Sequence, residues 1–474
     1  MIFSTMTFLA LFLPILVLLY FIIPRKWIGL KNTLLLIASL IFYGWGEPAN
    51  VFLILACVVC TYAASFFVSK RNKFALVFGV LVNVVPLIIY KYADFALVSI
   101  NQMFGLNVPY ANLILPTGIS FYTFQVLTYV IDLYRGKVER QDNLAYLTLY
   151  IFFFPQLIAG PIVRYSDIEE QLKERTHTLS DIAFGVRKFA FGLGRKMLAN
   201  QAGLVVRTIM TQPAGNIGAD MMWVGVVSYA VQIFLDFSGY SEMAIGLGYI
   251  FGFKFPENFN RPYISKSITE FWRRWHMTLS SFFRDYVYIP IGGNGRKVLE
   301  SGEVVYSTAK RIRNLFIVWA LTGLWHGASW NFVIWGLYFF VLLVMEKYVY
   351  GRFLERAPVL VSRLVTCFFY MIGWAIFMYD TNSVVELWNF VGRLFVGGTS
   401  VVGPRALAIQ GKLIIVAISM VMCMLDKPTF IVDAEKRYPR VYLTVQNVFA
   451  VFLLVFSVVF IIGESFNPFI YFRF

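Results

Sequence analysis

Apolar residues form long runs along the whole chain, separated by short polar segments. Many runs approach the ~20 residues that a helix needs to cross a bilayer, and such segments fold as helices because lipid offers no partner to a free backbone N–H or C=O group. We predict membrane segments at Thr5–Ile23, Thr33–Trp45, Val51–Val68, Phe74–Ile89, Ile114–Tyr134, Leu144–Val163, Met222–Asp236, Met243–Phe253, Ile312–Trp325, Asn331–Met345, Val359–Met378, Leu413–Leu425 and Val445–Ile462. Short pieces between Met222 and Trp335 indicate re-entrant helices. The pattern predicts an all-α polytopic membrane protein with one integral domain over residues 1–474.

Composition agrees with this class. Of the 474 residues, 59% are hydrophobic and only 14% are charged, whereas charged residues make up about a quarter of a soluble domain. The net charge of +15 is explained by Lys and Arg in cytoplasmic loops. A nucleic-acid partner is not expected, because the chain has no block of basic residues with interleaved aromatic residues outside the membrane segments. With the basic loops in the cytoplasm, both termini are predicted to be extracytoplasmic. Met1–Ile23 lacks a basic n-region and a cleavage site, so we expect a retained first span.

The segment 164–200, His177 and the four cysteines are all compatible with a membrane protein. Residues 164–200 place apolar side chains on one helical face and basic ones elsewhere, which predicts an amphipathic segment at the lipid interface that contacts membrane lipids. His177, just before this helix, is expected to be a solvated surface residue. The four cysteines lie in apolar runs and are expected to be small buried hydrophobes; they are Cys57, Cys60, Cys367 and Cys423.

The first candidate for chemistry is His326, in the run Leu-Thr-Gly-Leu-Trp-His-Gly-Ala-Ser-Trp-Asn from Leu321 to Asn331. An ionisable side chain at membrane depth is costly unless it has a partner or a function. Small residues, including Ser329, allow close approach of backbone or substrate, and Trp325 and Trp330 could wall a narrow slot. A histidine hydrogen-bonded between helices is the alternative interpretation.

The second candidate stretch runs from Thr269 to Ser280 and contains Trp272, Arg273, Arg274 and His276. On a helix, Trp272 and His276 share a face. The arginines suit either lipid phosphates at the membrane boundary or the phosphates of a polyanionic donor. Neither His276 nor His326 is flanked by Asp, Glu or Cys at metal-ligand spacing, so no metal is expected. A histidine base of near-neutral pKa in a dry cavity suits proton abstraction from a hydroxyl that attacks an activated acyl group.

These stretches resemble the membrane-bound O-acyltransferase family, and in particular its bacterial branch that acylates cell-envelope polymers. The resemblance rests on Trp-His-Gly-Ala-Ser-Trp at 325–330 and Phe-Trp-Arg-Arg-Trp-His-Met-Thr-Leu-Ser at 271–280. Further matches are Leu-Pro-Thr-Gly-Ile-Ser-Phe-Tyr-Thr-Phe at 115–124, Phe-Pro-Gln-Leu-Ile-Ala-Gly-Pro-Ile at 154–162, Leu-Asp-Phe-Ser-Gly-Tyr-Ser at 235–241 and Asp-Tyr-Val-Tyr-Ile-Pro-Ile-Gly-Gly-Asn at 285–294. The resemblance covers most of the chain.

The resemblance implies a ring of about 11–13 transmembrane or re-entrant helices around a central tunnel. It implies His326 as the catalytic histidine and His276 as the second active-site position. The implied reaction moves an acyl group, most simply acetyl from acetyl-CoA without another cofactor, toward an extracytoplasmic polysaccharide. An extracytoplasmic transferase and a polysaccharide synthase or secretion complex in the bacterial inner membrane are implied partners. For Trp272, Arg273 and Arg274 the expected role is donor binding.

Several other residues could take part in the reaction or could serve only the structure. Asp236, Gln125, Trp325 and Ser329 could line the tunnel, although Asp236 fits a structural hydrogen-bond acceptor and Gln125 fits inter-helix hydrogen bonding equally well. The C-terminal tail, residues 464–474, is aromatic and nearly uncharged, so it is expected to bury itself. Tyr471 would then either carry the acyl group as a tyrosyl ester or anchor the tail at the membrane interface.

Three other functions remain open at this stage. One is D-alanyl transfer to teichoic acid from a carrier protein, the activity of related family members. Another is transport or flipping of an envelope precursor, which broken helices and buried polar groups also suit. The third is a structural scaffold in a synthase complex, in which both histidines would be dispensable.

Overall fold

The computed structural model describes residues 1–211, 217–298, 304–396, 404–425, 429–463 and 469–470. The chain divides into two compact units. The first unit comprises residues 1–194, 237–257 and 443–473, and the second comprises residues 195–236, 258–442 and 474. Both units are helical, and the strands among the described residues form one two-stranded hairpin.

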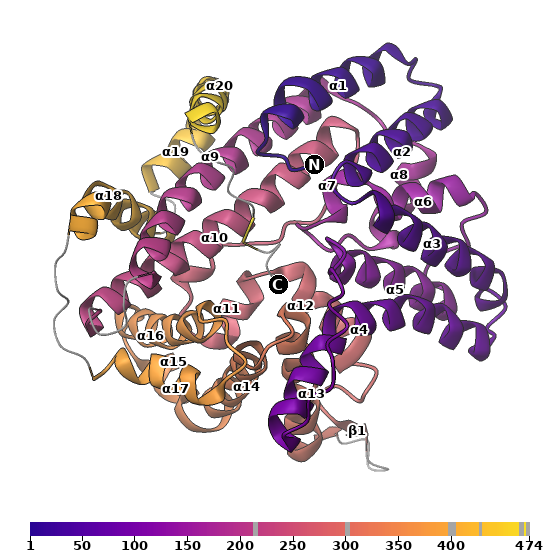
Figure 1. Ribbon diagram of the computed structural model, residues 1–474. Helices are drawn as coiled ribbons and strands as arrows, with labels where there is room; N and C mark the ends of the chain where they lie inside the picture. Colours follow the sequence, from indigo (N-terminus) through magenta and orange to yellow (C-terminus); the bar gives the residue numbers. More distant parts are fainter. Residues whose placement is uncertain (212–216, 299–303, 397–403, 426–428, 464–468, 471–474) are drawn as a thin grey trace. The chain divides into compact units, whose positions relative to one another are not determined.

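The first unit is built from apolar helices that lie against one another. Helices α2, α3, α5 and α6 are side by side (Figure 1). Tyr43 and Glu47, which end α2 and precede α3, bind the loop before α5 through the backbone and hydroxyl of Thr117. Its elements are η1 (Thr7–Phe12), α1 (Leu13–Ile22), α2 (Ile28–Gly44), α3 (Pro48–Val68), α4 (Lys73–Phe104), α5 (Ile119–Arg135), α6 (Leu144–Phe152), α7 (Phe154–Leu157), α8 (Tyr165–Lys173) and most of α20 (Pro439–Gly463).

Two long helices pass from one unit to the other: α9 (Leu179–Met210) and α10 (Ala219–Ile250). Within the first unit their backbones approach closely at glycines, because a Cβ added to Gly185 would lie 2.6 Å from the carbonyl oxygen of Gly246. A Cβ on Gly192 would lie 2.5 Å from the carbonyl oxygen of Gly239. Small residues at a helix crossing are typical of membrane bundles, where close backbone packing replaces the hydrophobic driving force.

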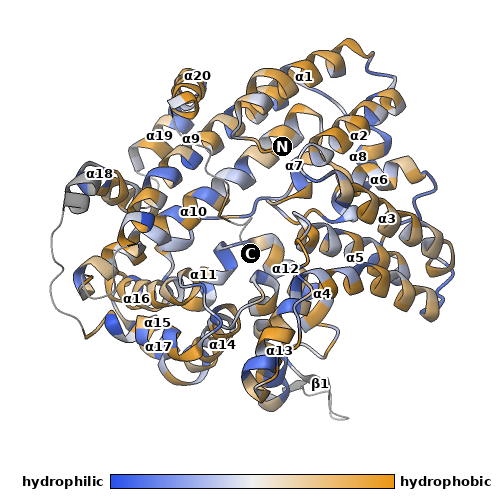
Figure 2. Cartoon of the chain, in the orientation of Figure 1, coloured by the Kyte–Doolittle hydropathy of each residue, from blue (hydrophilic) through white to orange (hydrophobic). Residues whose placement is uncertain are grey.

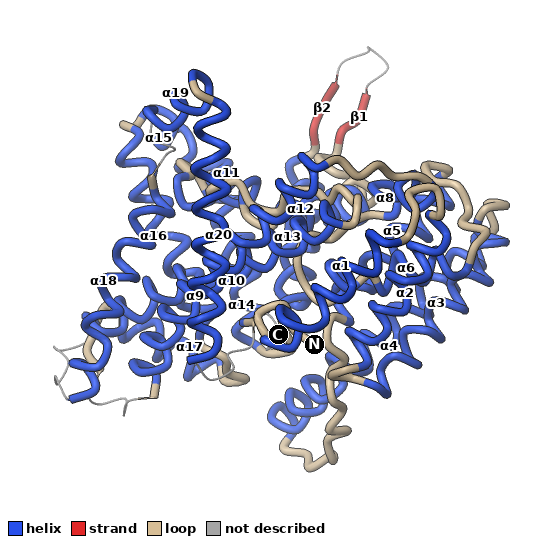
Figure 3. The backbone as a smooth tube through the Cα atoms, turned by 90° about the horizontal axis from the view of Figure 1, so that it is seen from above, coloured by secondary structure: helices blue, strands red, loops and turns tan. Residues whose placement is uncertain are grey.

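The second unit contains both candidate motifs. The short helices α11 and α12 carry the stretch around His276, and the packed pair α13 and α14 carries the stretch around His326. The β-hairpin stands beyond α12 and α13 in Figure 3. The elements are η3 (Pro262–Ile264), α11 (Ile268–Arg274), α12 (Met277–Phe283), η4 (Arg284–Tyr288), β1 (Arg296–Val298), β2 (Val304–Tyr306), α13 (Thr308–His326), α14 (Trp330–Met345), η5 (Glu346–Tyr350), α15 (Gly351–Arg356), α16 (Val359–Met378), α17 (Val384–Arg393), α18 (Pro404–Met424) and α19 (Thr429–Arg437).

Six described helices are long and apolar enough to cross a membrane: Pro48–Val68, Lys73–Phe104, Ala219–Ile250, Trp330–Arg356, Val359–Met378 and Pro439–Gly463. Hydrophobic residues run along most of the helices, α3 and α20 among them (Figure 2). Shorter apolar helices occur at Thr7–Ile22, Ile28–Gly44 and Gln410–Met424. The prediction of an all-α, multi-pass membrane protein is confirmed.

The structure corrects some sequence-based boundaries. The two segments expected at Met222–Asp236 and Met243–Phe253 are one helix, α10, which continues through Ser238 and Gly239. The amphipathic helix expected to end near residue 200 continues to Met210 as α9. Lys196, expected on its polar face, is buried and pairs with Asp236 at 2.6 Å.

The prediction that His177 is solvated is wrong. The side chain is 8% exposed, and Nε2 lies 2.8 Å from the Tyr20 hydroxyl and 3.3 Å from the carbonyl oxygen of Phe251. Burial, followed by the charge of Lys31, lowers the pKa of His177 to about 4. Although His177 has polar neighbours in the sequence, it is a buried, neutral side chain that joins α1 to the C-terminal end of α10 through its contacts with Tyr20 and Phe251.

The tail is described only in part. Tyr471 and the rest of the segment 464–474, apart from residues 469 and 470, lie outside the described residues. Phe469 is buried, with its ring 4.4 Å from that of Tyr240 in an edge-on contact. The expectation that the aromatic tail buries itself is confirmed for Phe469 and Ile470.

Candidate active site

One face of α13 lines an elongated cavity of about 480 Å³. The residues of that face follow helical spacing, so they form a single stripe: Arg311, Leu315, Val318, Trp319, Thr322 and His326. At about 1.5 Å per residue, the 15 positions from Arg311 to His326 correspond to about 22 Å along the helix axis. The cavity therefore connects a cationic end of α13 with its histidine end.

The opposite wall comes from the short helices α11 and α12, with Trp272, Arg273, Trp275, His276 and Leu279 among its residues. His276 sits at the junction of the two helices rather than inside one. Its backbone is left-handed, with φ 44° and ψ 54°, a region that a non-glycine residue seldom adopts and that is often associated with a function. The predicted histidine pair is thus brought to one cavity, from segments 50 residues apart.

The side chain of Asn258 contacts His276 and its neighbour Thr278 through hydrogen bonds. Its Oδ1 lies 3.0 Å from Nδ1 of His276 and accepts from the hydroxyl of Thr278 at 2.8 Å. The His276 ring stacks near Phe259 and contacts Trp325 edge-on at 5.8 Å between centroids. Burial lowers the pKa of His276 to about 3, below the near-neutral value expected from the sequence, so the ring is neutral at physiological pH.

His326 is enclosed by aromatic rings. Its ring lies 4.8 Å from those of Trp325 and Trp335 and 5.2 Å from that of Phe377, all nearly perpendicular. The side chain is 3% exposed. Trp325 contacts both histidines, but the tryptophans that line the cavity are Trp272, Trp275 and Trp319. Tunnel lining by Trp325 stays a prediction.

Glycines let α13 and α14 approach closely at the height of His326. A Cβ on Gly323 would lie 2.5 Å from the carbonyl oxygen of Phe332, and a Cβ on Gly336 would lie 3.1 Å from Cα of Gly323. Gly327 ends α13 directly after the histidine, and Phe332 fills the space that a side chain there would need. The small residues noted in the sequence therefore serve helix packing around the histidine.

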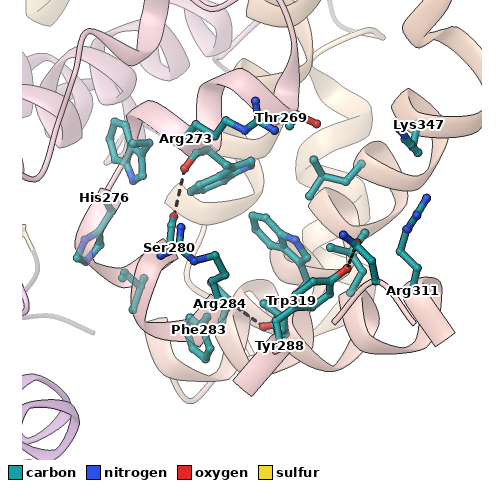
Figure 4. A pocket seen from close by; sticks show the side chains of 18 of the residues that line it. Thr269, Arg273, His276, Ser280, Phe283, Arg284, Tyr288, Arg311, Trp319 and Lys347 are labelled. Carbon is teal, nitrogen blue, oxygen red and sulfur yellow. Dashed lines mark hydrogen bonds between the residues drawn. The ribbon is translucent and has the colours of Figure 1, made fainter. Parts of the chain in front are cut away.

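Four cationic side chains are among the residues that line the cavity: Arg273, Arg284, Arg311 and Lys347. Figure 4 shows Arg311 and Lys347 on one side of the cavity and Arg284 apart from them, near Phe283 and Tyr288. Arg284 also pairs with Asp285 at 2.7 Å. A second cavity of about 750 Å³ shares Arg273 and Lys347 with the first and adds Lys266 and Arg352 to its lining. These basic side chains suit an anionic substrate, since Arg and Lys bind phosphates well.

The remaining predicted site residues lie elsewhere. Arg274 pairs with Glu270 at 2.8 Å, an arrangement that ties α11 together. Ser329 donates to Asp380 at 3.0 Å, and Asp236 pairs with Lys196. Gln125 belongs to the first unit and donates to the carbonyl of Gln156 at 3.3 Å. Donor binding by Arg274 and tunnel lining by the other three stay predictions.

Sequence reasoning missed Asn258, Arg311 and Lys347. Asn258 lies in the loop between α10 and α11, where no periodicity singles it out. The two cations fall in basic loops that the positive-inside rule already explained, so nothing in the sequence marked them as lining the cavity. Among the described residues no group of His, Cys, Asp and Glu side chains could hold a metal ion.

Comparison with known proteins identifies the class. Residues 133–385 match the membrane-bound O-acyltransferase family. The protein named probable alginate O-acetylase AlgI of Pseudomonas aeruginosa is 38% identical over 412 residues, covering 84% of this chain and 76% of that protein. The chain belongs to the membrane-bound O-acyltransferase family and is a multi-pass membrane acyltransferase.

Two further relatives show the range of polymers named within this family. The peptidoglycan O-acetyltransferase of Helicobacter pylori is 33% identical, covering 80% of this chain and 77% of that protein. The teichoic acid D-alanyltransferase of Bacillus subtilis is 34% identical over 51% of this chain and 61% of that protein.

Proposed function

We propose that this enzyme takes an acetyl group from acetyl-CoA on the cytoplasmic side and delivers it for O-acetylation of an extracytoplasmic polysaccharide. The single observation that carries the proposal is one cavity whose walls hold His276 and His326 together with the cationic side chains of Arg273, Arg311 and Lys347. The enzyme needs no cofactor besides its donor. His326 and His276 are the catalytic residues.

The shape of the cavity supports a thioester on a long anionic carrier. A CoA thioester has its phosphates at one end and its reactive carbonyl at the other, separated by the extended pantetheine arm. The span of about 22 Å along α13 separates Arg311 from His326 in the same way. Arg273, Arg311 and Lys347 hold phosphates, while Trp272 and Trp319 enclose the arm.

The relatives support the choice of acetyl and of a polymer acceptor. Five of them are named for alginate O-acetylation and one for peptidoglycan O-acetylation. The enzyme lies in the bacterial inner membrane with both termini outside the cytoplasm. A separate extracytoplasmic transferase places the group on the polymer, within a synthase or secretion complex, and Tyr471 is the candidate relay on this chain.

The D-alanyltransferase similarity supplies a second candidate function. In that case the donor is a carrier protein whose thioester arm enters the same cavity, and the basic side chains meet an acidic protein surface. Identity to the Bacillus subtilis protein extends over 51% of this chain, against 84% for the Pseudomonas aeruginosa relative, which favours acetyl transfer.

The test uses purified protein in nanodiscs with radiolabelled acetyl-CoA. Wild-type protein should release CoA and retain label, and His326→Ala should do neither. Loss of the label in Tyr471→Phe as well would place the acyl intermediate on the tail. Equal labelling of wild type and His326→Ala would contradict acyl transfer at this site.

A further inference from the structure

Asn258 makes several contacts with the segment that carries His276. Its side-chain Oδ1 faces Nδ1 of His276 at 3.0 Å, the hydroxyl of Thr278 at 2.8 Å and the backbone N–H of Thr278 at 3.3 Å. Its backbone carbonyl accepts from the N–H of Met277 at 2.9 Å. Both the ring and the left-handed backbone of His276 are thus fixed by this one residue.

These contacts determine which nitrogen of His276 carries the proton. A backbone N–H can only donate, so the Asn258 atom that faces Thr278 must be the amide oxygen and not the NH₂ group. That oxygen has only acceptor capacity, and Nδ1 of His276 must therefore donate to it. In a neutral imidazole the other nitrogen, Nε2, then holds the lone pair.

We infer that Asn258 is a positioning residue that holds His276 as the Nδ1–H tautomer, which makes Nε2 of His276 the proton acceptor of the acyl transfer. The inference rests on the proposed function and deepens it, because it separates the roles of the two histidines. His326, in its aromatic surroundings, then polarises the acyl carbonyl or orients the reacting groups.

The step balances with the groups named. Nε2 of His276 takes the proton of the attacking hydroxyl as the oxygen forms its bond to the acyl carbon. The carbon–sulfur bond of the thioester breaks, and the electron pair leaves with the sulfur. The imidazolium returns its proton to the thiolate, so that an ester and a free thiol result. Asn258 Oδ1 stabilises the transient imidazolium by accepting from Nδ1–H throughout.

The tautomer can be measured without any catalysis. The chain has three histidines, so the ¹⁵N solid-state NMR spectrum of histidine-labelled protein in lipid is simple, and His276→Gln identifies the resonances of interest. We expect a protonated Nδ1 and an unprotonated Nε2 at His276. A protonated Nε2 in wild-type protein would overturn the inference, even if the enzyme turned over acetyl-CoA.

Kinetics then test whether the tautomer matters. Asn258→Leu, of similar size, should lower kcat about 10²-fold, the lower range for a general base, with little change in KM for the donor. Asn258→Asp should restore much of kcat and move the acid limb of the kcat/KM profile to higher pH, because a carboxylate stabilises the imidazolium. The matched control is Asn260→Ala, an exposed asparagine two positions away, which should leave kcat unchanged.

Each outcome has a distinct meaning. Full kcat in Asn258→Leu, with the protein folded by size-exclusion chromatography, would refute the positioning role. A parallel loss in Asn258→Leu and Asn258→Asp with no change in pH profile would also refute it, since a merely structural role predicts that pattern. If wild-type protein turned over no acetyl-CoA, the proposed function would fail while the NMR spectrum still decided the tautomer.

Discussion

The close approach of α13 and α14 should position His326, and Gly323→Ala tests this directly. The added Cβ would lie 2.5 Å from the carbonyl oxygen of Phe332, whereas ordinary contact begins at 3.4 Å. The helices must therefore separate by about 0.9 Å (3.4 minus 2.5). Overpacking of this kind costs about 1–3 kcal/mol of stability. Because Gly323 lies one turn before His326, a displacement near 1 Å should also lower kcat about 10²-fold.

The assay pairs thermal unfolding in detergent with acetyl transfer. Gly392→Ala in α17 is the matched control, since a Cβ there meets nothing within 4 Å, and the change should stabilise by up to about 1 kcal/mol through helix propensity. We expect the melting temperature of Gly323→Ala to fall and that of Gly392→Ala to stay or rise. Unchanged stability and activity in Gly323→Ala would refute the idea that this contact positions the histidine.

Three further perturbations follow from the structure. Trp319→Ala removes a side chain that lines the cavity where the arm of the donor is proposed to lie and should raise KM for acetyl-CoA; an unchanged KM in a steady-state assay would show that this wall does not hold the arm. Lys196→Met leaves the Asp236 carboxylate buried without its ion-pair partner and should destabilise by about 3–5 kcal/mol, with Lys196→Met/Asp236→Leu recovering much of the loss in thermal unfolding; a double variant no better than the single would contradict this. His177 has its folded pKa lowered to about 4 from an ordinary value near 6.5, so the unfolded state binds more protons between these pH values. Stability should therefore fall as pH drops from about 6.5 to 4, and a pH–melting curve of His177→Gln should be flatter there than that of wild type.

The sequence predicted membrane helices best where the length of an apolar run alone decided the structure. The run Val359–Met378 was predicted with the same bounds as α16, because Pro358 is followed by a predominantly apolar stretch that is long enough to cross a bilayer. The pairing of His276 and His326 was predicted from motif resemblance, and both line one cavity. Periodicity alone would not have joined them, since His326 ends α13 and His276 lies at the junction of two other helices.

Other features depended on tertiary contacts that no local pattern encodes. Ser238 and Gly239 suggested a break, yet α10 continues through them because Gly239 packs against Gly192 of α9. Asn258 gains its importance only from the turn that brings His276 and Thr278 beside it. The positive-inside rule already accounts for Arg311 and Lys347 as basic residues near the ends of membrane segments. Their shared cavity depends on the packing of α13 against α14, which the sequence pattern does not show.

The most direct test of acyl transfer at the two histidines compares all three histidines of the chain in cells. Acetate released by mild alkali from the extracytoplasmic polysaccharide would be measured for His326→Gln, His276→Gln and His177→Gln, each normalised to folded protein in the membrane. We expect loss of polymer acetylation in the first two variants and retention in the third. Wild-type acetylation in His326→Gln would contradict this expectation.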